Sequence, residues 1–128
     1  MLGKSPFVYV EDIEKLAPSE KVVAIVPAGI RLREKLFSIL SKELKFPSYF
    51  GSNWDALNDC LCDFSWTDIF LITVIHHDIP ALGTHHTRIY LETLACCVEA
   101  WKPGDDHQLR VVFPLAQKVV IEEILSNI

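Results

Sequence analysis

Residues 46–61 read FPSYFGSNWDALNDCL, and they are the most informative stretch of the chain. It predicts a loop followed by a helix that begins at Ser52 or Asn53, because either side chain is a good helix N-cap. Gly51, immediately before them, suits a turn that needs a positive φ angle. At about 100° per residue, the helix would place apolar side chains on one face and carboxylates on the opposite face. The apolar side chains belong to Trp54, Leu57, Leu61 and Phe64, and the carboxylates to Asp55, Asp59 and Asp63.

The charge of this region is one-sided. The segment between Lys45 and Arg88 contains five aspartates and neither lysine nor arginine. Carboxylates at i,i+4 spacing on a helix repel each other by roughly 0.2–0.5 kcal/mol per pair, so the acidic face does not stabilise the fold. Two interpretations stay open: a solvated face on which Asp55 also favours the positive end of the helix dipole, or a surface that meets a positively charged partner.

Strands and helices alternate on both sides of this stretch. Continuous apolar runs rich in β-branched residues predict buried parallel strands. These runs cover residues 21–26, 69–75 and 108–113. Apolar residues at helical spacing predict helices over 30–44 and from Thr84 or His85 to Trp101. The predicted fold class is therefore α/β, with a small three-stranded parallel sheet packed with helices.

Two terminal segments could extend this fold. Residues 7–10 alternate aromatic side chains with valine and could add an N-terminal edge strand, and residues 119–128 could be helical. At 128 residues the chain predicts one domain, covering 1–128, with a sizeable hydrophobic core.

Composition excludes several classes of function. A net charge of -5 disfavours direct nucleic-acid binding, because a phosphate backbone needs a basic footprint. We expect no signal peptide and no membrane span, because no apolar run approaches about 18 residues. The four cysteines are then expected to be buried free thiols in a reducing cytosol, which predicts a cytoplasmic protein.

Residues 42–61, KELKFPSYFGSNWDALNDCL, resemble the helix–loop–helix of the barstar family, whose members inhibit the ribonuclease barnase. The proline, the aromatic pair, the glycine and the following run of Asn, Asp, Ala and Leu match without a gap. The resemblance covers about residues 21–113 and leaves extensions at 1–20 and 114–128. It implies a three-stranded parallel sheet with helices, no enzymatic activity, and neither a cofactor nor a metal.

The resemblance also implies a function and a site. A bacterial inhibitor of this kind, an immunity protein, would bind one-to-one to a basic ribonuclease or toxin domain and occlude its active site. Asp59 would be the central acidic contact and Asp55 the second. Asn58 and Phe64 stand where the family has tryptophans, so the partner need not be barnase itself. The remaining candidate contacts are Tyr49, Gly51, Ser52, Asn53, Asn58, Asp63 and Glu99.

Two alternatives remain. One is a protein-interaction module of the same fold whose partner is not a nuclease. The other is a small α/β enzyme or metal protein that uses a subset of its histidines. Adjacent histidines on an extended segment point to opposite faces, which does not suit a shared metal ion. The histidines concerned are His76, His77, His85 and His86.

Overall fold

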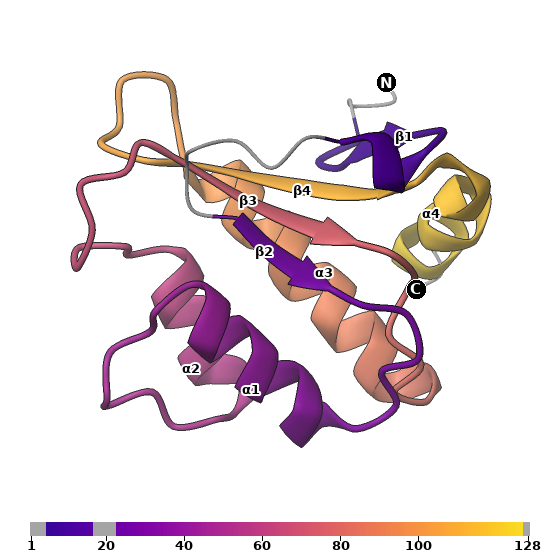
Figure 1. Ribbon diagram of the computed structural model, residues 1–128, viewed down its shortest axis with the longest axis horizontal. Helices are drawn as coiled ribbons and strands as arrows, with labels where there is room; N and C mark the ends of the chain where they lie inside the picture. Colours follow the sequence, from indigo (N-terminus) through magenta and orange to yellow (C-terminus); the bar gives the residue numbers. More distant parts are fainter. Residues whose placement is uncertain (1–4, 17–22, 127–128) are drawn as a thin grey trace.

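A computed structural model describes residues 5–16 and 23–126. Four strands form one sheet in the order β1-β4-β3-β2, and all three pairings are parallel (Figure 1). The predicted α/β class with a parallel sheet is confirmed, and the N-terminal strand is present as an additional edge strand beside β4. Residues 21, 22, 127 and 128, at the ends of two predicted segments, lie outside the described residues. The strands are β1 Val8–Val10, β2 Val23–Val26, β3 Leu71–His76 and β4 Gln108–Pro114.

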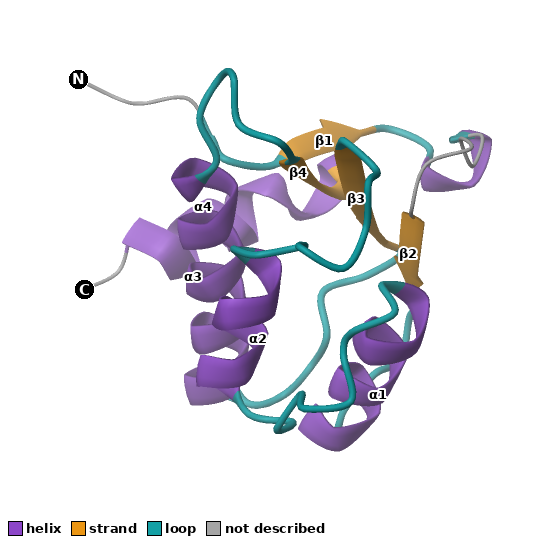
Figure 2. Ribbon diagram, turned by 90° about the vertical axis from the view of Figure 1, so that its left-hand side faces the viewer, coloured by secondary structure: helices purple, strands orange, loops and turns teal. Residues whose placement is uncertain are grey.

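The helices pack on one side of the sheet. Figure 2 shows α1, α2 and α3 together on that side, and α4 next to α3. Each predicted helix is present, with ends that differ by a few residues, and the described part of the C-terminal segment, residues 119–126, is helical. The helices are α1 Arg33–Glu43, α2 Trp54–Leu61, α3 Thr84–Ala100 and α4 Lys118–Ser126, with short 3₁₀ turns at Ile13–Lys15 and Leu115–Gln117.

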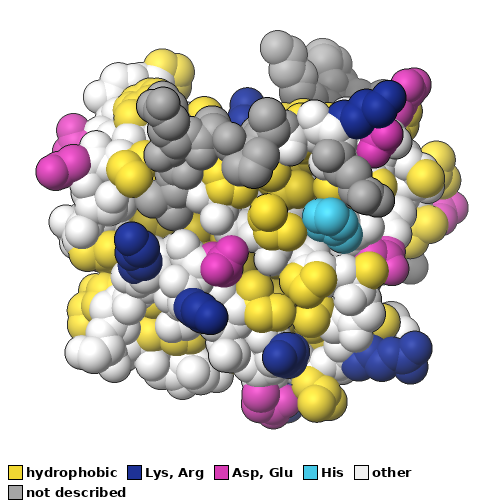
Figure 3. Space-filling view, in the orientation of Figure 1, with side chains coloured by type: hydrophobic (Ala, Val, Ile, Leu, Met, Phe, Trp, Pro, Cys, Tyr) yellow, Lys and Arg dark blue, Asp and Glu magenta, His cyan; other side chains and the backbone are white. Residues whose placement is uncertain are grey.

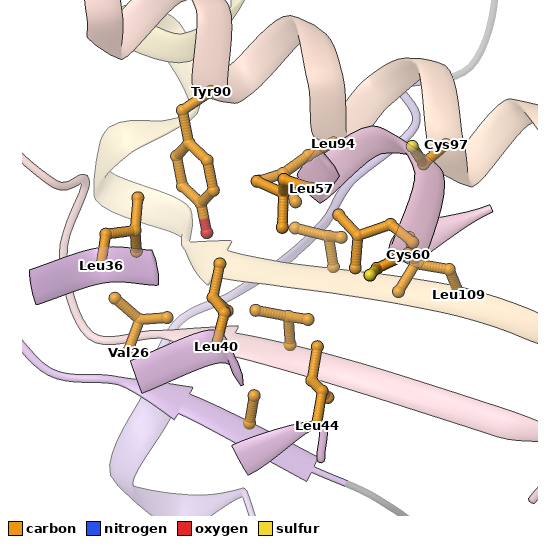
Figure 4. Packing of buried hydrophobic residues seen from close by; sticks show 14 of the residues in the cluster. Val26, Leu36, Leu40, Leu44, Leu57, Cys60, Tyr90, Leu94, Cys97 and Leu109 are labelled. Atoms are coloured by element: carbon orange, nitrogen blue, oxygen red, sulfur yellow. The ribbon is translucent and has the colours of Figure 1, made fainter. Parts of the chain in front are cut away.

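The hydrophobic core lies between the helices and one face of the sheet. Successive side chains on a strand point to opposite faces, and every second residue of β2, β3 and β4 is buried under the helices. Figure 4 shows side chains of α1, α2 and α3 converging on these strands. Residues from all these elements belong to one cluster, including Val26, Leu36, Leu40, Leu57, Cys60, Val74, Tyr90, Leu94 and Leu109.

Both terminal segments contribute to the same core. The rings of Phe7 and Phe113 lie 5.2 Å apart, and Ile121 of α4 is fully buried. Lys118 Nζ lies 5.7 Å from the centre of the Tyr9 ring, which joins α4 to β1. The described parts of both extensions, residues 5–16 and 114–126, therefore contribute packed side chains to this fold.

Candidate partner-binding surface

Two phenylalanines anchor the loop between α1 and α2. Phe46 follows the end of α1, where its amide donates to the Ser41 carbonyl at 2.9 Å and Lys45 has a φ of 56°. The Phe46 and Phe50 rings are 4.9 Å apart, so both ends of the loop are held against the core. Tyr49, between them, is 70% exposed. A fixed loop thus presents one aromatic side chain to solvent.

The start of α2 is capped as predicted. Asn53 is the N-cap residue, and its side chain accepts a hydrogen bond from the Ala56 amide at 2.7 Å. The expected positive φ at Gly51 is wrong, because the left-handed residue is Ser52, with a φ of 53°. Gly51 is instead a site of close packing: a Cβ atom there would lie 3.2 Å from Asn53 Nδ2. The absence of a side chain at Gly51 therefore makes room for the cap.

The apolar side of α2 is packed into the molecule. Leu57 and Leu61 are fully buried. Trp54 is half-buried, with its ring 4.9 Å from Phe37, and its Nε1–H donates to His86 Nδ1 at 3.2 Å. Packing against α1 and α3 thus fixes which side of α2 faces solvent.

Two of the predicted carboxylates lie on α2, and the third does not. Asp55 and Asp59 are exposed, one helical turn apart. The prediction that Asp63 belongs to the same helix face is wrong, because α2 ends at Leu61 and Cys62 is its C-cap. Asp63 lies in the following turn, where its carboxylate accepts from Ser65 Oγ at 3.0 Å. In the part of the chain that the structure describes, none of the three aspartates forms an ion pair.

The loop and the helix enclose a small cavity on this surface. It has a volume of about 130 Å³ and is lined by Tyr49, Phe50, Ala56, Asp59, Cys60 and Asp63. Partial desolvation, followed by the charge of Asp63, raises the pKa of the Tyr49 hydroxyl. Burial raises the pKa of Cys60 to about 11, and the two aspartates add to that rise. The cavity therefore combines negative charge with a protonated phenol, an arrangement suited to a cationic side chain.

A second cavity continues the acidic surface past the end of α2. Its volume is about 420 Å³, and Asp63 lines it together with Asp105 and Asp106. The sequence analysis missed this acidic pair, although it directly follows the Pro103-Gly104 turn after α3. Glu99 is exposed near the end of α3 and lines neither cavity. The structure thus brings together Tyr49, Asp59 and Asp63 but does not add Glu99 to them.

The basic side chains gather on a different element. Five of the twelve lysines and arginines lie between residues 31 and 45, and all five are exposed. Figure 3 shows basic side chains spread over the lower part of the face on which Figure 1 shows α1. Within the described ranges, none of the five forms an ion pair with an acidic side chain. Cations therefore cluster on and beside α1, whereas the charged side chains of α2 are both carboxylates.

The histidines do not form a shared site. His76 is fully buried, with Nε2 2.6 Å from the Tyr90 hydroxyl and Nδ1 3.1 Å from the Val112 carbonyl. Burial lowers its pKa to about 3, whereas the neighbouring His77 is exposed. Among residues 5–16 and 23–126, no group of three or more His, Cys, Asp or Glu side chains is placed to hold a metal ion. His76 is thus a core residue, and the enzyme alternative loses its first candidate.

The comparisons with known proteins identify the family. The family model described as Barstar (barnase inhibitor) matches residues 20–114, so the chain belongs to the barstar family. This confirms the resemblance seen in residues 42–61, and the family is one of inhibitors. A search of curated proteins found no match. In the described ranges, no helix has the length and apolar character needed to cross a membrane.

Proposed function

We propose that this protein inhibits a basic ribonuclease, or a toxin domain of that kind, by covering its active site in a one-to-one complex. The observation that carries the proposal is the acidic surface at Asp55, Asp59 and Asp63, which form no ion pair within the described residues. The membership of the chain in the barstar family supports it. A ribonuclease active site must hold phosphates, so it is lined with cations. Carboxylates presented on a rigid loop and helix can take the place of those phosphates.

Each proposed contact has a distinct position. Asp59 would occupy the centre, because it lines the small cavity beside Tyr49. Asp55, in the first turn of α2, would pair with a second cation of the partner. Asp63, at the rim of the contact surface, would steer the approach of the partner. Gly51, Ser52 and Asn53 would contact the partner through the turn that begins the helix. Asn58 and Glu99 complete the proposed set.

The role follows from this chemistry. A free ribonuclease harms the cell that makes it, so an immunity function in the cytoplasm of a bacterium would suit such an inhibitor. The chain would supply no catalytic group and no cofactor. Its partner would be a protein and not a nucleic acid, because the proposed contact surface is acidic.

The test is inhibition of a small microbial ribonuclease of the barnase class by the parent protein and by Asp59→Ala. We expect stoichiometric inhibition by the parent and binding weakened by about 2 kcal/mol or more in the variant, which is roughly 30-fold. Asp68→Ala is the matched control, because Asp68 is exposed but lines neither cavity. A folded Asp59→Ala protein that inhibits as strongly as the parent would contradict the central role of Asp59.

One observation favours a second candidate function, an interaction module whose partner is not a nuclease. Phe64, at one of the positions where the family has a tryptophan, is only 1% exposed. Its ring lies 5.5 Å from Trp66 and 6.1 Å from Trp101. Asn58, at the other position, is polar, so neither position offers an aromatic anchor to a partner, and such anchors often dominate binding. Failure of the parent to inhibit any ribonuclease of the barnase class would favour this alternative.

A further inference from the structure

A pair of cysteines joins the end of α2 to α3. Cys62 is the C-cap residue of α2, and its sulfur lies 3.1 Å from that of Cys97, which is 35 residues further along the chain. A disulfide bond is about 2.05 Å long, so the two sulfurs need to approach by only about 1 Å. The proximity of the two thiols is a product of the packing of α2 on α3.

The two thiols differ in access to solvent. Cys62 is exposed and Cys97 is buried, although the sequence predicted four buried thiols. Cys62 also lines the larger acidic cavity, which gives a small molecule a route to its sulfur. Burial raises the pKa of the Cys97 thiol, and the hydrogen bond with Cys62 adds to that rise. Cys62 is therefore the thiol that an oxidant reaches first, and Cys97 is placed to react with the oxidised Cys62 side chain.

We propose that Cys62 and Cys97 form a redox cross-link between α2 and α3, and that hydrogen peroxide, a small neutral molecule, is the oxidant. Asp63, Asp105 and Asp106 surround the approach to Cys62, and their charge repels anionic oxidants. A neutral peroxide is not repelled. This assignment stands on the positions of the two sulfurs and is independent of the identity of the binding partner.

The reaction balances in two steps. The Cys62 thiolate attacks one peroxide oxygen, the O–O bond breaks, and Cys62 becomes a sulfenic acid while the hydroxide that leaves is protonated to water. The sulfur of Cys97 then attacks the sulfur of Cys62, the S–O bond breaks, and the second hydroxide leaves as water with the proton of Cys97. Two electrons pass from the two thiols to the peroxide, which yields one disulfide and two water molecules.

The cross-link would also alter the binding surface proposed above. Cys97 Sγ lies 3.3 Å from Asn58 Oδ1 and 3.6 Å from the Asn58 carbonyl, both as hydrogen-bond acceptors. A disulfide sulfur has no hydrogen to donate, so oxidation frees the Asn58 amide. Asn58 directly precedes Asp59, which links the redox state of the thiols to the central acidic residue.

The test compares full-length parent, Cys62→Ser and Cys96→Ser proteins after treatment with hydrogen peroxide at neutral pH. Free thiols are counted by maleimide labelling under denaturing conditions, and linked peptides are identified by mass spectrometry. We expect the oxidised parent to take up two labels fewer than the reduced parent and to yield a Cys62–Cys97 peptide. Its melting temperature should rise by roughly 5–10 °C, because the cross-link closes a long loop in the unfolded chain.

The two variants distinguish a cross-link between Cys62 and Cys97 from one that involves the adjacent Cys96. Cys96 is also exposed and lies next to Cys97, so Cys96→Ser is the matched control and should form the same cross-link. Cys62→Ser changes an exposed side chain, should fold normally, and should lose the cross-link. Linkage of Cys62 to Cys96, covalent dimers, or over-oxidised Cys62 with Cys97 still free would overturn the proposal. A cross-linked protein with a lower melting temperature would also contradict the link between α2 and α3.

Discussion

The buried pair of His76 and Tyr90 makes the stability of this protein depend on pH in a calculable way. In the folded protein His76 is neutral: its Nδ1–H donates to the Val112 carbonyl and its Nε2 accepts from the Tyr90 hydroxyl. Protonation would place a charge in the core and remove the acceptor that Tyr90 needs. Burial accordingly lowers the pKa of His76 from 6.5 to about 3.

The sign of the effect follows from proton binding. Below pH 6.5 the unfolded chain takes up a proton at this position, whereas the folded protein does not until the pH approaches 3. The stability from His76 is therefore complete above pH 6.5 and is lost as the pH falls toward 3. Between about pH 7 and pH 5 this linkage should lower the free energy of unfolding by about 2 kcal/mol.

The assay is urea unfolding at pH 7, 6 and 5, followed by tryptophan fluorescence. His76→Gln is the informative variant, because glutamine can donate to Val112 and accept from Tyr90 but cannot titrate. We expect this variant to lose most of the pH dependence, whatever its stability at pH 7. A small dependence of the free energy of unfolding on pH should remain, because partial desolvation and the charge of Arg33 lower the pKa of His86, as burial does for His76.

His77→Gln is the control, because His77 is the neighbouring, exposed histidine. The free energy of unfolding of this variant should change with pH as much as that of the parent. Equal slopes for the parent and His76→Gln, or a parent whose stability does not change between pH 7 and pH 5, would refute the reasoning.

Three further predictions concern α2 and its surroundings. Asn53→Ala should lower the free energy of unfolding by about 1 kcal/mol in urea titration, since it removes the N-cap bond, and Asn53→Asp should restore it; equal stability of the alanine variant would show that the cap is not needed. Trp101→Phe should lower the free energy of unfolding by about 1 kcal/mol, because the indole N–H donates to the Leu61 carbonyl at 2.9 Å; a variant as stable as the parent would mean that water replaces this bond. Asp63→Asn should slow association with a basic ribonuclease and reduce its salt dependence in stopped-flow experiments, and an unchanged rate would remove Asp63 from the steering role.

Local patterns predicted most of the fold. The β-branched runs corresponded to β2, β3 and β4, because β-branched side chains favour strands. Burial on both faces holds for most of β3, whereas Ile25 of β2 and Arg110 of β4 are exposed. The capped start of α2 was predicted from Asn53, because an N-cap interaction reaches only to the next helical turn. The family was predicted from residues 42–61, because the residue types of the family's motif follow one another there without a gap.

The candidate surface was predicted only in part. Asp55 and Asp59 lie on the exposed side of α2, as helical periodicity requires. Asp63 lies beyond the helix, because periodicity does not show where a helix stops, and the positive φ falls on Ser52, one residue later than expected. The contact roles of these residues stay predictions until a partner is tested.

By itself, the sequence determined what depends on near neighbours: the alternation of strands and helices, the cap at Asn53 and the concentration of aspartates after Lys45. Only the tertiary structure decided which distant residues meet. It set the strand order, buried His76 against Tyr90, and placed Cys62 beside Cys97. The physical reason is that periodicity records which face of an element is buried, whereas the partner on that face is chosen by the packing of the whole core.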